Sequence, residues 1–317
     1  MKDSSIEGAQ TIDHYNFFGV IIDAAYPYKN QQGKFICTVK VVDHSYHHRG
    51  GSDTVQPVFA TVIIYAKRLD DLPVVTNIGD IIRVHRATMK QYQEQKQFHV
   101  NVFFNSSWCL FRTKTDGDSM DDMDGDMSDQ EVEESKPHDE DQQMMEEDRA
   151  TEREQKRKYR PYKFSGKTYT FDMNHEKVIL DDLRSWTANY FAKEYVITKD
   201  MYKLLKDLKS GSDTNSSSEF DLLVKILKVF EKDENTLEIR VKDISQKMYE
   251  MTVPRLKFHP GVLRSGEIVR IRCVELNLTT KRDVIQMKPY TNILRINHGA
   301  RIYQELYKAI EEEKETD

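Results

Sequence analysis

The chain has 317 residues and a formal net charge of −6, with 38% hydrophobic and 32% charged residues. This length suffices for about two domains, and no apolar run is long enough to predict a membrane-spanning helix. The polar N-terminus does not resemble a secretory signal. Three cysteines, Cys37, Cys109 and Cys273, lack the spacing of a zinc site, and we expect reduced side chains of an intracellular protein.

The net charge conceals two oppositely charged parts. Residues 114–148 contain sixteen acidic and two basic side chains, a net of −14, which leaves +8 for the rest of the chain. A basic folded part suits a polyanionic partner, although this charge alone is weak support. Residues 116–148 lack aromatics and predict a solvated, disordered linker. The alternative is an acidic mimic of nucleic acid that competes for the basic grooves.

The first half of the chain contains five predicted strands. Their ranges are 15–24, 34–43, 57–66, 79–87 and 97–104. A short helix or turn at 67–75 connects the third strand, which is apolar enough to be buried on both faces, to the fourth. This order is typical of the OB-fold, a small Greek-key β-barrel that binds ligands on its second and third strands and adjacent loops.

A basic strand occurs twice. In residues 79–87, Ile82 and Val84 alternate with Arg83 and His85, which the period of two places on an exposed row. Residues 266–274 repeat this pattern, with Arg270 on the corresponding row. The repeat predicts two copies of one small β-domain, each presenting a basic strand.

The fifth strand also has two distinct faces. One parity is apolar and is predicted to face the core: Phe98, Val100, Val102 and Phe104. The other parity is polar and ends in an aromatic residue: Gln97, His99, Asn101 and Phe103. Hydrogen-bonding groups beside a flat ring are typical of a groove for single-stranded bases.

The second half begins with a basic, aromatic stretch at 149–167, which either follows a phosphate backbone or is a solvated linker. Helical periodicity predicts helices at 172–195 and 198–208. The predicted strands that follow are 219–230, 237–241, 247–258, 266–274 and 283–290, and a closing amphipathic helix is predicted at 297–313.

The resulting fold is mainly β with flanking helices: two tandem OB-fold domains joined by a disordered acidic linker. We place the first OB-fold in residues 1–113, an acidic and then basic linker in 114–168, and a helical segment with the second OB-fold and C-terminal helix in 169–317.

Several stretches closely resemble one family. They are YPYKNQQGKFICTVKVVD, VIIYAKRLDDLP, GDIIRVHRATMKQY and QFHVNVFFNSSW in the first half, and EFDLLVKILKV, GEIVRIR and PYTNI in the second. They resemble the telomere end-binding protein alpha subunits of ciliates, in the protection-of-telomeres family. The resemblance implies two tandem OB-folds that bind the single-stranded, G-rich 3′ overhang of telomeres in the nucleus. It also suggests a short form without the family's C-terminal third OB domain.

The resemblance also implies contact residues. In the first barrel these are Lys29, Phe35, Lys40, Tyr92, Gln97, Phe103 and Phe104, and in the second Asp221, Arg272 and Tyr290. Arg83, His85 and Arg270 come from strand parity alone. Asp221 would accept a hydrogen bond from the exocyclic amine of guanine; the alternative is a solvated strand-edge carboxylate. Phe103 and Phe104 have opposite parities, so they share a groove only at a bulge or strand end.

An enzymatic function has little support. The chain has no P-loop, HExxH or GxSxG motif, and His47, His48 and His85 are not spaced as metal ligands. We therefore expect no catalytic residue, cofactor, metal, small-molecule substrate or membrane contact. The resemblance implies a binder of G-rich telomeric single strands that protects chromosome ends or regulates telomerase access. The alternatives are a sequence-tolerant single-strand binder and a scaffold for telomere replication or telomerase that does not cap ends.

Overall fold

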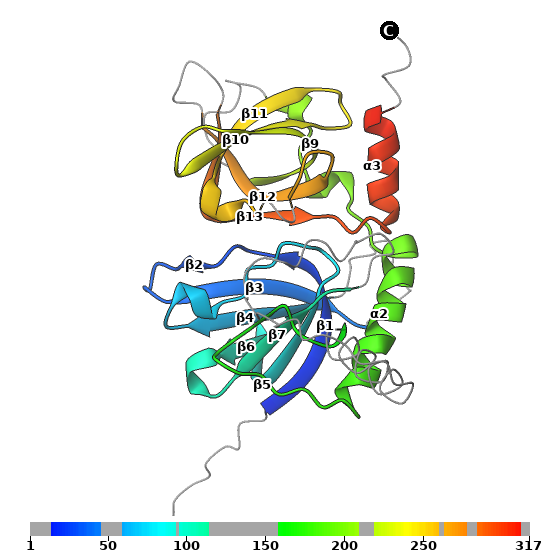
Figure 1. The fold of residues 1–317 in the computed structure, drawn as a ribbon. Helices are drawn as coiled ribbons and strands as arrows, with labels where there is room; N and C mark the ends of the chain where they lie inside the picture. Colours follow the sequence, from blue (N-terminus) through cyan, green and yellow to red (C-terminus); the bar gives the residue numbers. More distant parts are fainter. Residues whose placement is uncertain are drawn as a thin grey trace, which may run out of the picture.

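The computed structural model describes residues 14–45, 59–92, 95–113, 158–208, 219–259, 263–277 and 284–311. These residues form two β-barrels stacked on each other, with one helix running beside each (Figure 1). The predicted acidic tract at 114–148 lies outside the described residues. The mainly β fold and the two tandem OB-fold barrels are confirmed.

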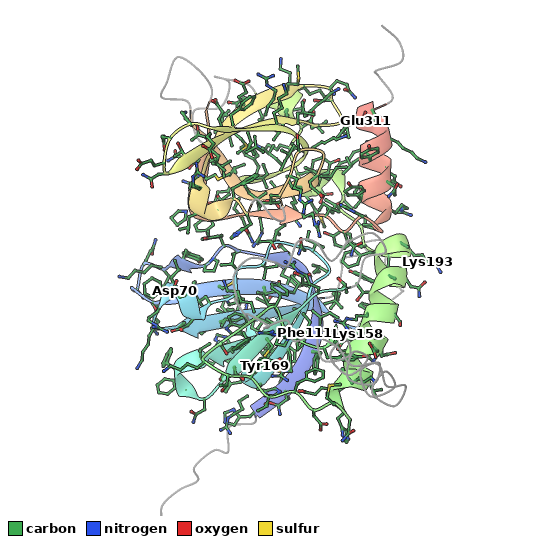
Figure 2. All side chains as sticks on the ribbon, in the orientation of Figure 1. Asp70, Phe111, Lys158, Tyr169, Lys193 and Glu311 are labelled. Carbon is green, nitrogen blue, oxygen red and sulfur yellow. The ribbon has the colours of Figure 1, made fainter. Side chains whose placement is uncertain are left out.

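The first barrel contains eight strands. They are β1 (His14–Ala24), β2 (Tyr28–Lys29), β3 (Phe35–Val42), β4 (Ala60–Ala66), β5 (Ile81–Tyr92), β6 (Gln95–Asn101), β7 (Ser107–Phe111) and β8 (Lys163–Phe164). The strand order is β1-β3-β4-β6-β5-β7-β8, and β1 also pairs with β5, which closes the barrel. β4 and β6 are parallel, and β2 forms a hairpin with β3. Phe111 is among the side chains that fill the interior (Figure 2).

Three predicted boundaries in this barrel differ from the structure. β5 continues to Tyr92, through a stretch predicted as a loop, and β6 ends at Asn101, where the 3₁₀ turn η2 (Val102–Phe104) follows. The sequence prediction missed β7. Residues 158–168 were assigned to the linker, but β8 pairs with β7 and buries Tyr159 against the first core. Residues 114–157 lie outside the part of the chain that the structure describes.

The second barrel contains five strands, in the order β11-β10-β9-β12-β13. They are β9 (Phe220–Glu231), β10 (Thr236–Lys242), β11 (Met248–Pro254), β12 (Ile268–Asn277) and β13 (Val284–Arg295). The 3₁₀ turn η6 (Arg255–Lys257) follows β11, and α3 (Arg301–Glu311) packs Leu306 and Ile310 against the barrels. The helix predicted at 198–208 is instead two 3₁₀ turns, because the backbone N–H groups of Lys203 and Leu205 bond to Asp221 and Asp243.

Helix α2 (Glu176–Lys193) covers the first barrel beside β1 and β5. Its buried side chains follow helical spacing: Leu180, Leu183, Thr187, Tyr190 and Phe191. Arg83 lies beneath this helix and is only 2% exposed; its Nη1 lies 2.7 Å from Oε2 of Glu176. The predicted exposed cationic row is therefore wrong for Arg83, because a helix distant in sequence covers it.

The two barrels share packed surface. Leu223, Ile268 and Leu294 of the second barrel belong to the same buried cluster as the first core. Backbone hydrogen bonds also cross the junction: Ile78 donates to the carbonyl of Arg295, and Arg295 donates to that of Thr76. This continuity fixes the position of second-barrel side chains relative to the face of the first.

Candidate nucleic-acid interface

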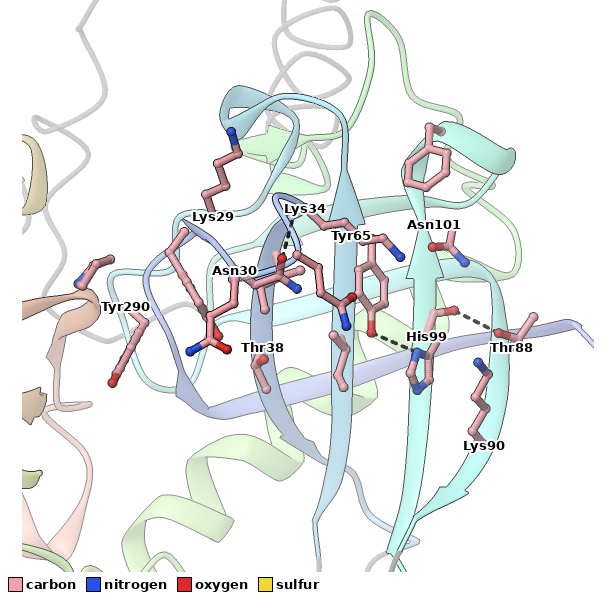
Figure 3. Close-up of a pocket in the computed structure, with 17 residues that line it drawn as sticks. Lys29, Asn30, Lys34, Thr38, Tyr65, Thr88, Lys90, His99, Asn101 and Tyr290 are labelled. Carbon is pink, nitrogen blue, oxygen red and sulfur yellow. Dashed lines mark hydrogen bonds between the residues drawn. The ribbon is translucent and has the colours of Figure 1, made fainter. Parts of the chain in front are cut away.

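A groove of about 790 Å³ crosses the outer face of the first barrel and ends at the second barrel (Figure 3). Strands β3, β4, β5 and β6, the β2–β3 hairpin, and Pro289 and Tyr290 of β13 line it. Because side chains alternate across a strand, every second residue faces this groove: Thr38 on β3, Tyr65 on β4, and His99 on β6 are examples.

Four aromatic side chains line the groove: Tyr28, Tyr65, Phe103 and Tyr290. The rings of Tyr28 and Tyr290 lie 5.1 Å apart across the junction between the barrels. Phe103 lies toward the opposite end and is 37% exposed, with Nζ of Lys67 at 5.8 Å from its ring centroid. Phe103 is exposed and the other three rings are half-buried. Aromatic rings that line a groove in this way are platforms on which unpaired bases stack.

The charged side chains among the described lining residues of the groove are all positive. Lys29, Lys34 and Lys90 line it, and no aspartate or glutamate is among the described lining residues. Side-chain amides add both donors and acceptors: Asn30, Gln31, Gln32 and Asn101. A lysine-lined groove with hydrogen-bonding groups suits a flexible polyanion that carries bases.

Tyr65 and His99 form a pair in the middle of the groove. The Tyr65 hydroxyl lies 3.2 Å from Nδ1 of His99, and the rings stack with centroids 5.7 Å apart (Figure 3). Burial, and secondarily the nearby Lys90 ammonium, lowers the pKa of His99. The imidazole is therefore held neutral at pH 7 in the free protein, while an approaching phosphate would favour its charged form.

The structure brings three predicted contact residues into this groove: Lys29, Phe103 and Tyr290. Two more continue the same face beyond it. Tyr92 has the parity of the lining residue Lys90 on β5 and is 58% exposed, and Gln97 has the parity of His99 and pairs with Lys90. Strand alternation therefore places Tyr92 and Gln97 on the groove side of the sheet.

Phe35 and Phe104 lie outside the groove lining. Phe35 packs against the first core, and Nζ of Lys29 lies 5.6 Å from its ring centroid. Phe104 was predicted by parity to face the core, but it is 72% exposed because β6 ends before it. The η2 turn breaks the alternation and leaves the rings of Phe103 and Phe104 4.4 Å apart. Residues of opposite parity can share a groove at a bulge or at a strand end, and here β6 ends just before this pair.

The remaining predicted residues are engaged within the protein. His85 Nε2 lies 3.5 Å from Glu176 beneath α2, and burial lowers its pKa. Arg270 and Asp221 bind each other, with Nη2 2.5 Å from Oδ2. Asp221 also accepts a hydrogen bond from the backbone N–H of Cys273. Strand parity placed Arg270 on an exposed row; that placement is wrong, because the side chain lies mostly buried beside Asp221.

Lys40 and Arg272 converge on a carboxylate that the sequence did not single out. Asp23 of β1 is 3% exposed, and its oxygens lie 3.3 Å from Nζ of Lys40 and 3.0 Å from Nε of Arg272. The Lys40 ammonium also lies 4.7 Å from the ring centroid of Phe59. Both cations therefore have internal partners at the junction between the barrels.

Sequence reasoning missed Tyr65, Thr38 and Lys90 as groove residues. The strand that carries Tyr65 was predicted to be buried on both faces, but its burial alternates strictly from Ala60 to Ala66. The signal was present, since the polar Thr61 and the Tyr65 hydroxyl share one parity with Ile63, whereas the other parity is wholly aliphatic. Among the described residues, no cluster of three potential metal ligands occurs and no helix is long and apolar enough to span a membrane.

Comparison with known proteins agrees with this architecture. The family model described as telomeric single stranded DNA binding POT1/CDC13 matches residues 4–197, and that of the telomere end-binding protein alpha subunit OB2 domain matches residues 207–308. A crystal structure of fission yeast Pot1 with single-stranded DNA aligns over 98% of this chain and 90% of that chain, at 11% identity. Its TM-score of 0.33 is too low to support a structural argument.

Two curated relatives are both named telomere-binding protein subunit alpha. The chain is 36% identical over 306 residues to the telomere-binding protein subunit alpha of Stylonychia mytilus, covering 95% of this chain and 54% of that protein. It is 35% identical over 302 residues to the subunit alpha of Sterkiella nova, covering 94% and 53%. The chain thus spans about half the length of these relatives. Because the first family model alone matches more than half of the chain, this protein belongs to the telomeric single-stranded DNA-binding POT1/CDC13 family.

Proposed function

We propose that this chain binds the single-stranded, G-rich 3′ overhang of telomeres in the first-barrel groove. The observation that carries the proposal is the composition of the groove: four aromatic rings and three lysines, with no carboxylate among its described lining residues. Family membership gives the polyanion its identity, since the matching family model is one for telomeric single-stranded DNA.

Binding follows from these residues. Bases stack on the exposed ring of Phe103 and on the half-buried ring of Tyr290 at the two ends, and stacking of this kind contributes roughly 1–3 kcal/mol per base. The ammonium groups of Lys29, Lys34 and Lys90 face the phosphates and release counterions. Tyr92 and Gln97 extend the same face, and Phe104 adds an exposed ring beside Phe103.

Selectivity for guanine is assigned to the groove amides. Guanine presents acceptors at N7 and O6 and donors at N1 and its exocyclic amine, and Asn and Gln side chains complement both kinds. Asn101 on β6 and Asn30 in the hairpin face the groove. Asp221 would have to leave Arg270 and the Cys273 N–H before it could accept from guanine.

The role in the cell follows from the ligand. A non-catalytic protein that occupies the 3′ overhang in the nucleus would protect the chromosome end or control the access of telomerase to it. The curated relatives are named for telomere binding, which supports this location. A further telomere protein or telomerase is the expected protein partner.

The test is a binding titration by fluorescence anisotropy at one fixed, stated salt concentration. Three labelled strands of equal length are compared: a G-rich telomeric overhang, its C-rich complement and a mixed sequence. We expect strong preference for the G-rich strand. Equal affinity for all three would support a sequence-tolerant single-strand binder instead, and no binding to any would favour the scaffold function and overturn the proposal.

A further inference from the structure

Tyr290 lies in β13 where the pairing of this strand with β12 is interrupted. β12 and β13 pair as far as Arg272 with Asn292 and resume at Val274 with Met287, so Cys273 alone faces residues 288–291. We call these four residues the 288–291 bulge. An extra length of chain in one strand bends it and leaves backbone groups without ladder partners. The bulge therefore needs donors from elsewhere to hold its shape.

Lys257, at the end of η6, supplies those donors. Its Nζ donates to three carbonyl oxygens of the bulge, at 2.9 Å for Lys288, 2.6 Å for Pro289 and 2.7 Å for Thr291. An ammonium has three N–H donors, so all are used. The side chain is buried, with Lys257 8% exposed, and no carboxylate pairs with it among the described residues. Burying an ammonium is unfavourable unless hydrogen bonds replace those it made with water, and the three carbonyls do so here.

Tyr26 of the first barrel contacts both Lys257 and the 288–291 bulge. Nζ of Lys257 lies 4.6 Å from the Tyr26 ring centroid, a cation–π contact. The Tyr26 hydroxyl donates to the carbonyl of Leu256 at 3.0 Å, and its backbone N–H donates to the carbonyl of Tyr290 at 3.1 Å. Lys257 thus binds the carbonyls of Lys288, Pro289 and Thr291, while Tyr26 binds the carbonyl of Tyr290. The Tyr28 ring lies against Tyr290.

We infer that Lys257 is a positioning residue for single-stranded DNA: it holds the 288–291 bulge against the first barrel, so that Tyr290 and Tyr28 form the second-barrel wall of the groove. This inference rests on the proposed function. Lys257 itself does not line the groove, so its effect on DNA passes through Tyr290.

Burial lowers the pKa of Lys257 to about 8, which gives the inference a second readout. The titratable groups around the ammonium are Tyr26, whose pKa burial raises, and Tyr290, whose hydrogen bond to Glu219 raises its pKa to about 12. Lys288 of the bulge is ion-paired with Glu275. Burial also raises the pKa of Cys273, which faces the bulge. Among the described groups around Tyr290, Lys257 is therefore the one that loses charge between pH 7 and pH 9.

The experiment is a double-mutant cycle on affinity for the G-rich strand at pH 7. Lys257→Met and Tyr290→Ala are each expected to weaken binding by roughly 5- to 150-fold, the range of one lost stacking contact. The double variant should bind the G-rich strand no more weakly than the more strongly affected single variant does. Phe103→Ala, at the far end of the groove, is the matched control, and its effect should multiply with that of Lys257→Met.

The pH profile is measured on the folded wild-type protein and on Tyr290→Ala, so it does not require Lys257→Met to fold. Wild-type affinity should fall from pH 7 to pH 9, and the fall should vanish in Tyr290→Ala. Multiplying effects of Lys257→Met and Tyr290→Ala, or the same pH profile in both proteins, would overturn the inference alone. Wild-type protein that fails to bind the G-rich strand would overturn the proposed function and the inference together.

Discussion

The carboxylate of Asp23 in the first barrel lies 3.0 Å from Nε of Arg272 in the second, and both side chains are largely buried. Lys40 approaches the other carboxylate oxygen at 3.3 Å. Neither oxygen of Asp23 has a donor aligned for a hydrogen bond among the described residues, so charge rather than hydrogen-bond geometry dominates these contacts. The ionic cluster joins the two barrels, as does the contact between the rings of Tyr28 and Tyr290.

Replacement of Asp23 by Asn should therefore destabilise the protein strongly. The change leaves the Arg272 guanidinium buried without its counter-charge, and breaking a buried pair in this way typically costs about 3–5 kcal/mol. Urea denaturation followed by circular dichroism measures the loss. The matched control is Asp71→Asn, which breaks the pair of Asp71 with the exposed Arg68 and should cost about 1 kcal/mol or less. Equal losses in the two variants would contradict the ionic role of Asp23.

Replacement of Phe103 by Ala should weaken DNA binding without unfolding the protein. The ring is partly exposed at the end of the groove, so its removal deletes a stacking platform worth roughly 1–3 kcal/mol and little core packing. Anisotropy titration and thermal melting separate the two effects. Tyr307→Ala, an exposed aromatic on α3, is the control and should leave affinity unchanged. An unchanged affinity in Phe103→Ala would show that the groove is misassigned.

The sequence patterns predicted the barrels better than the charged sites. A period of two is a local property, so Val84 and Val100 could be assigned to the core from the sequence, and both are fully buried. Arg83 could not be assigned, because its cover comes from α2, whose Glu176 lies 93 residues further along the chain. The partner of Arg272, Asp23, likewise comes from the other barrel. Strand periodicity does not indicate which distant element covers a given face of a strand.

The aromatic residues show the same division. Tyr290 was predicted through resemblance, and Phe103 through both resemblance and strand parity; both residues reach one groove. No periodic pattern predicts the η2 turn or the 288–291 bulge that present them. Tyr65 was missed for a different reason: a hydrophobic count over its strand hid an alternation that parity alone would have revealed. Local sequence rules therefore did not predict the two irregular backbone segments of the site, the η2 turn and the 288–291 bulge.

Replacement of Lys90 by Ala should reduce the salt dependence of binding. Lys90 lines the groove with its ammonium available to phosphate, and each phosphate contact on a single strand contributes about 0.7 to the slope of log affinity against log salt. Titrations at several salt concentrations measure the slope, which should become shallower by about that amount. Lys193→Ala at the end of α2 is the matched control, since Lys193 is exposed away from the groove (Figure 2). Identical slopes in wild type and Lys90→Ala would remove Lys90 from the phosphate path.

Affinity for DNA should rise as the pH falls below about 6.5, the ordinary pKa of histidine. Burial lowers the pKa of His99 in the free protein, and a bound phosphate favours the protonated ring, so binding takes up a proton. A rise of about one pKa unit on binding would strengthen affinity by up to about tenfold. Anisotropy titrations between pH 7.5 and pH 5.5 (roughly one unit either side of that value) measure the change.

His99→Gln keeps a polar side chain in the groove and should abolish this pH dependence. His85 also titrates with a lowered pKa, but it lies beneath α2 beside Glu176 rather than in the groove. A histidine with a lowered pKa binds fewer protons when folded, so stability falls as the pH drops below the unfolded value. Circular dichroism at each pH therefore confirms that the protein stays folded. A pH dependence that persists in His99→Gln would assign the proton to another group and exclude His99 as the linked site.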